Sequence, residues 1–261
     1  MIDLKDDSDK GEDGVFMRKR LILINHIILL PLIVLGIGLA DSLLTKGSFS
    51  EAISGKKNLK EIKLPQPSYK GEISVEEAIF YRRSIREYKR EPLSIREISQ
   101  ILWAAAGSNI DGITGATRVA PSAGACYPIE TYLVVGEVKK ISPGVYHYDW
   151  QEHKLTLLIP GDLRQELAKA ALGQKMIQKA PASLVFAALY PRTLRRYGQR
   201  GFRYVHIDVG CMVQNVYLQS QTLGLGTVNI GAFFDEKVKE ILDLKDEQPL
   251  CIMPFGKIGE K

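Results

Sequence analysis

The sequence has little cysteine and no compact set of metal-binding residues. Its three cysteines, Cys126, Cys211 and Cys251, lie far apart, form no CxxC pair and make no closely spaced group with the four histidines. Scattered cysteines in odd number do not build a disulfide framework, and structural zinc needs closely spaced Cys and His ligands. The sequence therefore predicts neither a disulfide-stapled fold nor a metal site.

A strong excess of one charge is also missing. The 35 basic and 30 acidic residues leave a net charge of +5, spread along the chain without a concentrated basic block. Proteins that bind nucleic acid usually carry such a block, so we expect no nucleic-acid partner. There is no internal repeat or low-complexity tract, and the 45% hydrophobic content is that of a globular protein with a buried core.

The one long hydrophobic run lies near the N-terminus. Residues 1–16 are mostly charged or small and predict a disordered polar tail. Within residues 17–45, the stretch from Leu21 to Ala40 is uncharged and follows three basic residues. A helix needs about twenty apolar residues to span a bilayer, so this segment is predicted to be a membrane anchor or a cleavable signal peptide. Both interpretations make the protein membrane-anchored or exported, and the flanking basic residues leave the side of the membrane open.

The remaining chain divides into a linker and one domain. Residues 46–68 are polar, contain glycine and proline and show no period, which is typical of a linker. In residues 69–261, Ser74 with Glu77 and Ser94 with Glu97 have the spacing of capping boxes and predict two helix starts. Further helices are predicted over 162–172, 205–223 and 235–242, and strands over 131–135, 144–149, 154–159, 183–189, 227–230 and 249–255. This order indicates an α+β fold.

Three segments have residues suited to a ligand. Three guanidinium groups and a hydroxyl fall within five residues at a predicted helix end, which suits a phosphate or, alternatively, a solvated basic turn: Arg82, Arg83, Ser84 and Arg86. The small residues from Pro121 to Ala125 let a backbone approach a flat ligand closely, or simply form a tight turn. The segment from Gly224 to Phe233 places a strand between glycine turns, where amides could meet a ligand edge or glycines could serve packing alone.

The order and spacing of these segments resemble the nitroreductase-like flavoproteins, and more closely their SagB-type branch. The resemblance covers residues 69–261 and is carried by RRSIREY, PSAGACYPIETYLVV, GLGTVNIGAF and MPFGKIGEK. Two longer phrases, PGVYHYDWQEHKL and YGQRGFRYVHIDVGCMVQNVYLQSQTLGLG, resemble the SagB-type branch in particular.

The resemblance implies the nitroreductase-like fold, with a central mixed or antiparallel sheet flanked by helices. It also implies a homodimer with one flavin mononucleotide (FMN) at each subunit interface. It also implies ping-pong electron transfer between NAD(P)H and a small organic substrate. Arg82, Arg83, Ser84 and Arg86 would hold the flavin phosphate and ribityl chain. The other implied cofactor contacts are Pro121, Ser122, Ala123 and Gly124 from the partner subunit, the backbone amides of Ile230 and Gly231, and Gly256 with Lys257.

The resemblance leaves two further functions open. Members that oxidise azolines to thiazoles and oxazoles in peptides use a Lys-Tyr pair just before the long helix, and the matching positions here are Arg196 and Tyr197. An arginine stays protonated and cannot act as an ordinary base, so this departure argues against azoline dehydrogenation, although both residues remain candidates for catalysis. The other alternative is a membrane-tethered module that binds flavin or carries electrons without an organic substrate of its own.

No Ser-His-Asp triad or pair of catalytic carboxylates is evident, and hydride transfer requires neither. His206 and Asp208 are two residues apart on a predicted helix. Such residues point to different faces, so we expect structural roles for both.

Overall fold

The computed structural model describes residues 60–108 and 117–259. The predicted tail, the hydrophobic segment of residues 17–45 and most of the linker lie outside the described residues. None of the helices within the described ranges is long and apolar enough to cross a membrane. The anchor or signal peptide therefore stays a prediction from the sequence.

A seven-stranded sheet forms the centre of the domain, in the order β1-β4-β3-β2-β5-β7-β6. All six pairings between these strands are antiparallel, which confirms the predicted α+β class with a sheet of the antiparallel kind. The strands are β1 (Glu61–Lys63), β2 (Ile129–Val135), β3 (Gly144–Asp149), β4 (Lys154–Pro160), β5 (Ala182–Ala188), β6 (Leu225–Thr227) and β7 (Gln248–Lys257).

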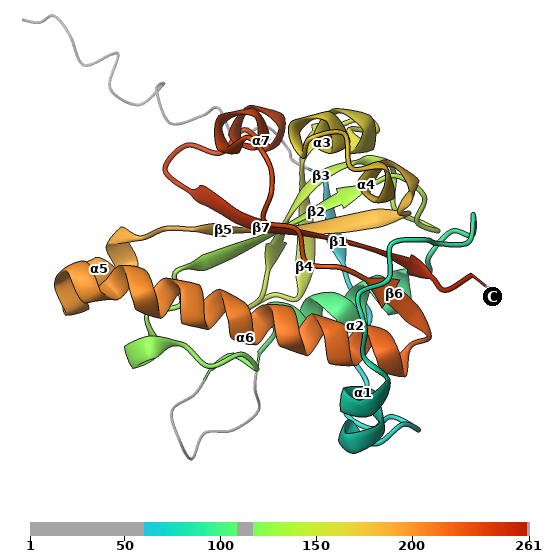
Figure 1. The fold of residues 1–261 in the computed structure, drawn as a ribbon, viewed down its shortest axis with the longest axis horizontal. Coiled ribbons are helices and arrows are strands. Elements are labelled where there is room, and N and C mark those ends of the chain that lie inside the picture. The colour runs from blue at the N-terminus through green and yellow to red at the C-terminus, as the bar shows by residue number, and fades with distance from the viewer. Residues whose placement is uncertain (1–59, 109–116, 260–261) are drawn as a thin grey trace, which may run out of the picture. The chain divides into compact units, whose positions relative to one another are not determined.

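Helices cover both faces of this sheet. They are α1 (Val75–Tyr81), α2 (Ile95–Ala106), α3 (Arg164–Ala170), α4 (Lys175–Lys179), α5 (Pro191–Tyr197), α6 (Gly201–Thr222) and α7 (Asp235–Leu242). Figure 1 shows α2 and α6 on one side and α3, α4 and α7 on the other. Alternate residues of β2 follow this division: Leu133 packs in the core beneath α2 and α6, and Val134 in the core beneath α3, α4 and α7.

Both predicted capping boxes are present. The Ser74 and Ser94 hydroxyls accept hydrogen bonds from the amides of Glu77 and Glu97, whose carboxylates accept from the serine amides in return. The two helices differ in burial, because α2 buries eight residues whereas α1 buries Ala78 alone. Helix α1 therefore leaves Phe80, 79% exposed, and its apolar neighbours on the surface of the single chain.

The structure differs from the sequence-based expectation at several boundaries. Part of the expected linker pairs with β4 as the edge strand β1, and Leu64 after it is buried. The strand expected over 227–230 lies earlier, as β6, and Ile230 forms a separate bridge with Ile252. Helix α6 starts at Gly201, one turn before its expected start, and the short helices α4 and α5 were not predicted.

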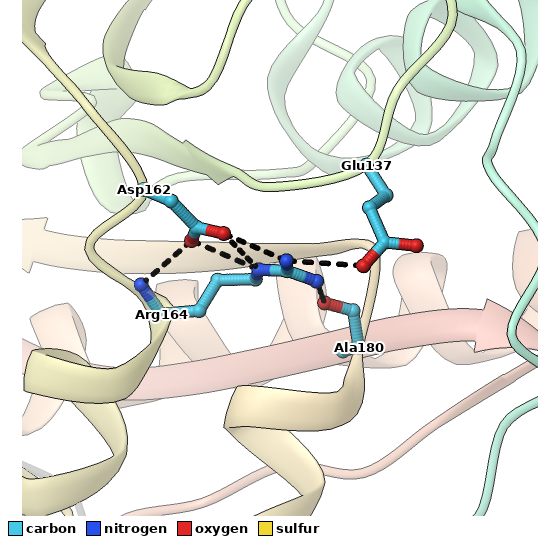
Figure 2. Close-up of polar contacts among 4 residues, drawn as sticks. All are labelled: Glu137, Asp162, Arg164 and Ala180. Atoms are coloured by element: carbon cyan, nitrogen blue, oxygen red, sulfur yellow. Dashed lines mark hydrogen bonds and ion pairs between the residues drawn. The ribbon is translucent and has the colours of Figure 1, made fainter.

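An arginine fixes the start of α3 against the sheet (Figure 2). Arg164 donates from Nε and Nη2 to the Asp162 carboxylate, at 2.9 and 2.7 Å, and from Nη1 to the Ala180 carbonyl at 3.0 Å. Its Nη2 also lies 3.1 Å from Glu137 Oε1. The guanidinium crosses Gly136, where an added Cβ would lie 1.8 Å from Arg164 Nε. Only glycine leaves room for this arginine.

We predict that Gly136→Ala destabilises the protein by about 2 kcal/mol, because the methyl group displaces the guanidinium from its hydrogen bonds. The free energy of unfolding in urea, followed by tryptophan fluorescence, measures the effect. Gly210→Ala is the control, since Gly210 lies inside α6 and an added Cβ there meets no atom within 4 Å. Equal stability of the Gly136 variant and wild type would contradict the account of Figure 2.

Candidate functional site

Tyr217 of α6 joins two of the predicted ligand-binding segments. Its hydroxyl is hydrogen-bonded to Ser84 Oγ at 3.0 Å and accepts the Asn229 amide at 2.8 Å. The Arg82 guanidinium carbon lies 5.2 Å from the centre of the Tyr217 ring, a cation–π distance. One side chain thus holds the arginine-rich segment beside the segment after β6.

Backbone packing brings the same two segments together. The Ile85 amide donates to the Thr227 carbonyl at 2.9 Å. Gly226 is buried, and an added Cβ would lie 2.5 Å from Ile85 Cγ2, so the close approach needs glycine. Arg83 and Arg86 are exposed and form no hydrogen bond or ion pair with another residue of the described ranges. We call residues 82–86 with 226–231 the first cluster.

The predicted amide donors in this cluster are not equivalent. The Ile230 amide donates to the Ile252 carbonyl at 2.9 Å, and the Ile230 side chain is buried. Gly231 is exposed, and no atom lies within 4 Å of where its Cβ would be. Of the two predicted donors, Gly231 is the one with open space beside it.

The C-terminal pair, Gly256 and Lys257, is engaged with the chain itself. An added Cβ on Gly256 would lie 2.8 Å from Pro181 Cδ, so this glycine permits tight packing. The Lys257 ammonium forms an ion pair with Glu97. Burial raises the pKa of Glu97, but the hydrogen bond from Lys257 and those of the capping box outweigh it and lower the pKa below the usual range. Glu97 therefore neutralises much of the Lys257 charge.

A second cluster forms around the loop from Pro121 to Tyr127. Asp208 of α6 is 5% exposed and accepts hydrogen bonds from Ser122 Oγ at 2.6 Å and the Ala123 amide at 3.2 Å. Ser122 Oγ also accepts the Tyr127 amide at 2.9 Å. Burial raises the pKa of Asp208, and the two donated hydrogen bonds oppose this rise. Asp208 is thus the anchor of the loop.

The candidate catalytic residues meet this loop at Gly124. Arg196 Nη1 donates to the Gly124 carbonyl at 3.1 Å, and an added Cβ on Gly124 would lie 2.4 Å from the Tyr197 hydroxyl. Gly124 has a φ of 59°, which also favours glycine. The structure therefore brings Arg196 and Tyr197 beside the predicted loop from Pro121 to Gly124.

Glu130 of β2 holds α5 in this position. Its carboxylate lies 2.5 Å from Arg192 Nη1 and 2.8 Å from His147 Nε2. Burial raises the pKa of Glu130, but the His147 hydrogen bond and the Arg192 charge outweigh it and lower the pKa to about 2. A carboxylate that stays ionised at neutral pH thus fixes the start of the helix that carries Arg196 and Tyr197.

Helix α6 separates the two clusters. Asp208 and Tyr217 are nine residues apart, which is two and a half turns, so they lie on opposite sides of the helix and about 14 Å apart along its axis. His206 is hydrogen-bonded to Tyr190 at 2.8 Å, away from Asp208, which confirms that these two form no dyad.

A cavity with a volume of about 570 Å³ lies elsewhere in the domain. The segment after β1, helix α2 and the C-terminal half of α6 form its walls, which include Tyr69, Trp103 and Leu218. None of the predicted site residues lines it. The second cluster instead borders a smaller pocket, whose lining includes Pro121, Ser122, Tyr127 and Asp208.

Comparison with known proteins identifies the family. The family model for nitroreductases matches residues 79–257. The chain belongs to the nitroreductase family. It is 47% identical over 197 residues to MJ1384 of Methanocaldococcus jannaschii, named as a nitroreductase, covering 76% of this chain and 96% of that protein. A nitroreductase-type crystal structure from Ralstonia eutropha JMP134 has a TM-score of 0.66 at 30% identity, covering 77% of this chain and 90% of that one.

Relatives in the nitroreductase family also include a peptide-processing protein. The microcin B17-processing protein McbC of Escherichia coli is 28% identical over 179 residues, covering 66% of this chain and 65% of McbC. The chain thus spans slightly less than two thirds of McbC. These matches confirm the resemblance to the nitroreductase-like proteins and their SagB-type branch, and they place the protein among the oxidoreductases.

We predict that Asp208→Ala releases the loop from Pro121 to Tyr127 and lowers the free energy of unfolding by about 2 kcal/mol, because two donors lose a charged acceptor. Hydrogen exchange of the Ala123 amide measures the release and is expected to accelerate. Asp208→Asn keeps one carbonyl acceptor at the same place and is expected to restore most of the protection. Unchanged exchange in Asp208→Ala would show that the loop does not depend on Asp208.

Proposed function

We propose that the protein is an FMN-dependent oxidoreductase that transfers electrons in two half-reactions between NAD(P)H and a small organic substrate. The observation that carries the proposal is the first cluster, in which Tyr217 joins the arginine-rich segment to Asn229, two residues before the exposed Gly231. When bound, a flavin supplies the hydride-transfer chemistry, so the protein has to bind it, orient it and exclude water.

The charges of the first cluster fit a phosphate. Arg83 and Arg86 are exposed cations without a carboxylate partner in the described ranges, and Ser84 adds a hydroxyl. A dianionic phosphate is bound best by fixed guanidinium groups. Arg82 is fixed over the Tyr217 ring and completes the set. Lys257 is a weaker candidate for the phosphate contact, because Glu97 neutralises its charge. Gly231 offers a backbone amide for the edge of the flavin ring.

The separation of the two clusters supports a homodimer. The loop from Pro121 to Gly124 lies across α6 from the first cluster, so one flavin cannot contact both within one chain. A second copy brings its own loop, with Arg196 and Tyr197, to the first cluster. The exposed apolar residues of α1 also fit a surface that is covered in the assembly. Attachment to a membrane or export through residues 17–45 is part of the proposal and is supported by the sequence alone.

A peptide azoline dehydrogenase is the second candidate, favoured by the similarity to McbC. The described contacts argue against it, because Arg196 is a permanently charged donor already bound to the Gly124 carbonyl. In the proposed enzyme, Arg196 and Tyr197 shape the substrate side of the site, and Arg196 removes no proton.

We predict that Arg83→Gln or Arg86→Gln weakens FMN binding by about 10- to 100-fold, because each substitution removes a charge-assisted hydrogen bond to the phosphate. Fluorescence titration of the flavin-free full chain with FMN measures the dissociation constant. Riboflavin, which lacks the phosphate, is expected to bind wild type and variants equally.

Arg90→Gln is the matched control, because Arg90 is an exposed arginine of the same segment outside the cluster. FMN affinity that is equally reduced in this control, or unchanged in both cluster variants, would contradict the proposed phosphate site.

A further inference from the structure

The junction of α5 and α6 carries an unusual run of positive charge. Five arginines lie between Pro191 and Ile207, and no acidic residue interrupts them. Two carboxylates near this run already have partners: Glu130 binds His147 and Arg192, and Asp208 binds the loop at Ser122 and Ala123.

These arginines divide into two kinds. Arg192 and Arg196 have protein partners, the Glu130 carboxylate and the Gly124 carbonyl. Arg195, Arg200 and Arg203 are exposed and make no hydrogen bond or ion pair within residues 60–108 and 117–259. Three cations in nine residues, without a counter-charge, repel one another and create a positive potential that an anion would relieve.

Local structure strengthens this potential. Arg200 and Arg203 are three residues apart at the start of α6 and therefore lie on neighbouring parts of its surface. The 22-residue helix begins without a capping side chain or an acidic residue in its first turn, so its positive end adds to the arginine charges. The Tyr197 ring of α5 and the Tyr204 ring of α6 pack edge to face, with their centres 4.9 Å apart, and so connect the two helices.

We propose that Arg200 and Arg203 form an anion subsite that binds a carboxylate or phosphate group of the substrate. Arg196 and Tyr197, in the same junction, contact the loop from Pro121 to Gly124, so an anion held here lies next to the proposed reaction site. The subsite is distinct from the first cluster, because Arg203 and Tyr217 are about 21 Å apart along α6. The inference rests on the proposed function and names the class of substrate that this function uses.

The direct test is the binding of inorganic pyrophosphate to the full chain by calorimetry at low ionic strength. Arg200→Gln/Arg203→Gln is expected to weaken binding by about tenfold or more, because it removes two charged donors. Lys175→Gln/Lys179→Gln is the control, since it removes the same charge from exposed positions on α4, across the sheet. Absence of binding to wild type, or equal loss in both double variants, would overturn the subsite.

Two kinetic comparisons then identify the source of the anion. In the Arg200→Gln/Arg203→Gln variant, a larger rise in KM for NADPH than for NADH assigns the subsite to the 2′-phosphate on the adenosine ribose of NADPH. A larger rise in KM for 4-nitrobenzoate than for uncharged 4-nitrobenzyl alcohol assigns the subsite to a carboxylate of the electron acceptor. If KM changes equally within both pairs of compounds, the proposed role of the subsite in substrate binding is wrong. A wild-type chain that binds no flavin would instead refute the proposed function. Pyrophosphate binding that is weakened only in the Arg200→Gln/Arg203→Gln variant would still support the anion subsite.

Discussion

The packing of α6 against the sheet is the contact on which both clusters depend. Val205, Met212 and Val216 form a buried stripe at helical spacing and pack in the core with α2 and the sheet. Burial of each such side chain contributes about 1.5 to 3 kcal/mol, so the rotation of the helix about its axis is strongly fixed. Asp208 and Tyr217 flank this stripe on opposite sides, and each anchors one of the segments that carry the proposed function.

The distribution of neutralised and free cations distinguishes structural charge from charge available to a ligand. Arg164 and Lys257 are paired with carboxylates and serve the fold. Arg83, Arg86, Arg200 and Arg203 have no such partner among the described residues. Arg90 is exposed and unpaired as well, so what sets these two groups apart is that each lies beside a segment of the proposed site. One group fits the phosphate of a cofactor, and the other fits a charged substrate.

Much of the fold could be predicted because its signals are local. The capping boxes at Ser74 and Ser94 and the alternation in the β3–β4 hairpin depend on residues a few positions apart. Strand β1 could not be found, since three residues with a mixed pattern gain their structure only by pairing with β4. The predicted site segments follow the family pattern. Asp208 was expected to have a structural role, but its partner was not predicted, and Tyr217 was missed. Their partners lie 86 and 133 residues away, and only the folded chain reveals them.

The central claim is that this surface binds a redox-active flavin mononucleotide. The most direct measurement is the visible spectrum of the purified full chain, with chromatography of any released cofactor, before and after anaerobic addition of NADH or NADPH. The account predicts flavin absorption that is bleached by one or both nicotinamides and a released cofactor that migrates as FMN. A protein that shows no flavin spectrum, even after reconstitution with FMN, would contradict it.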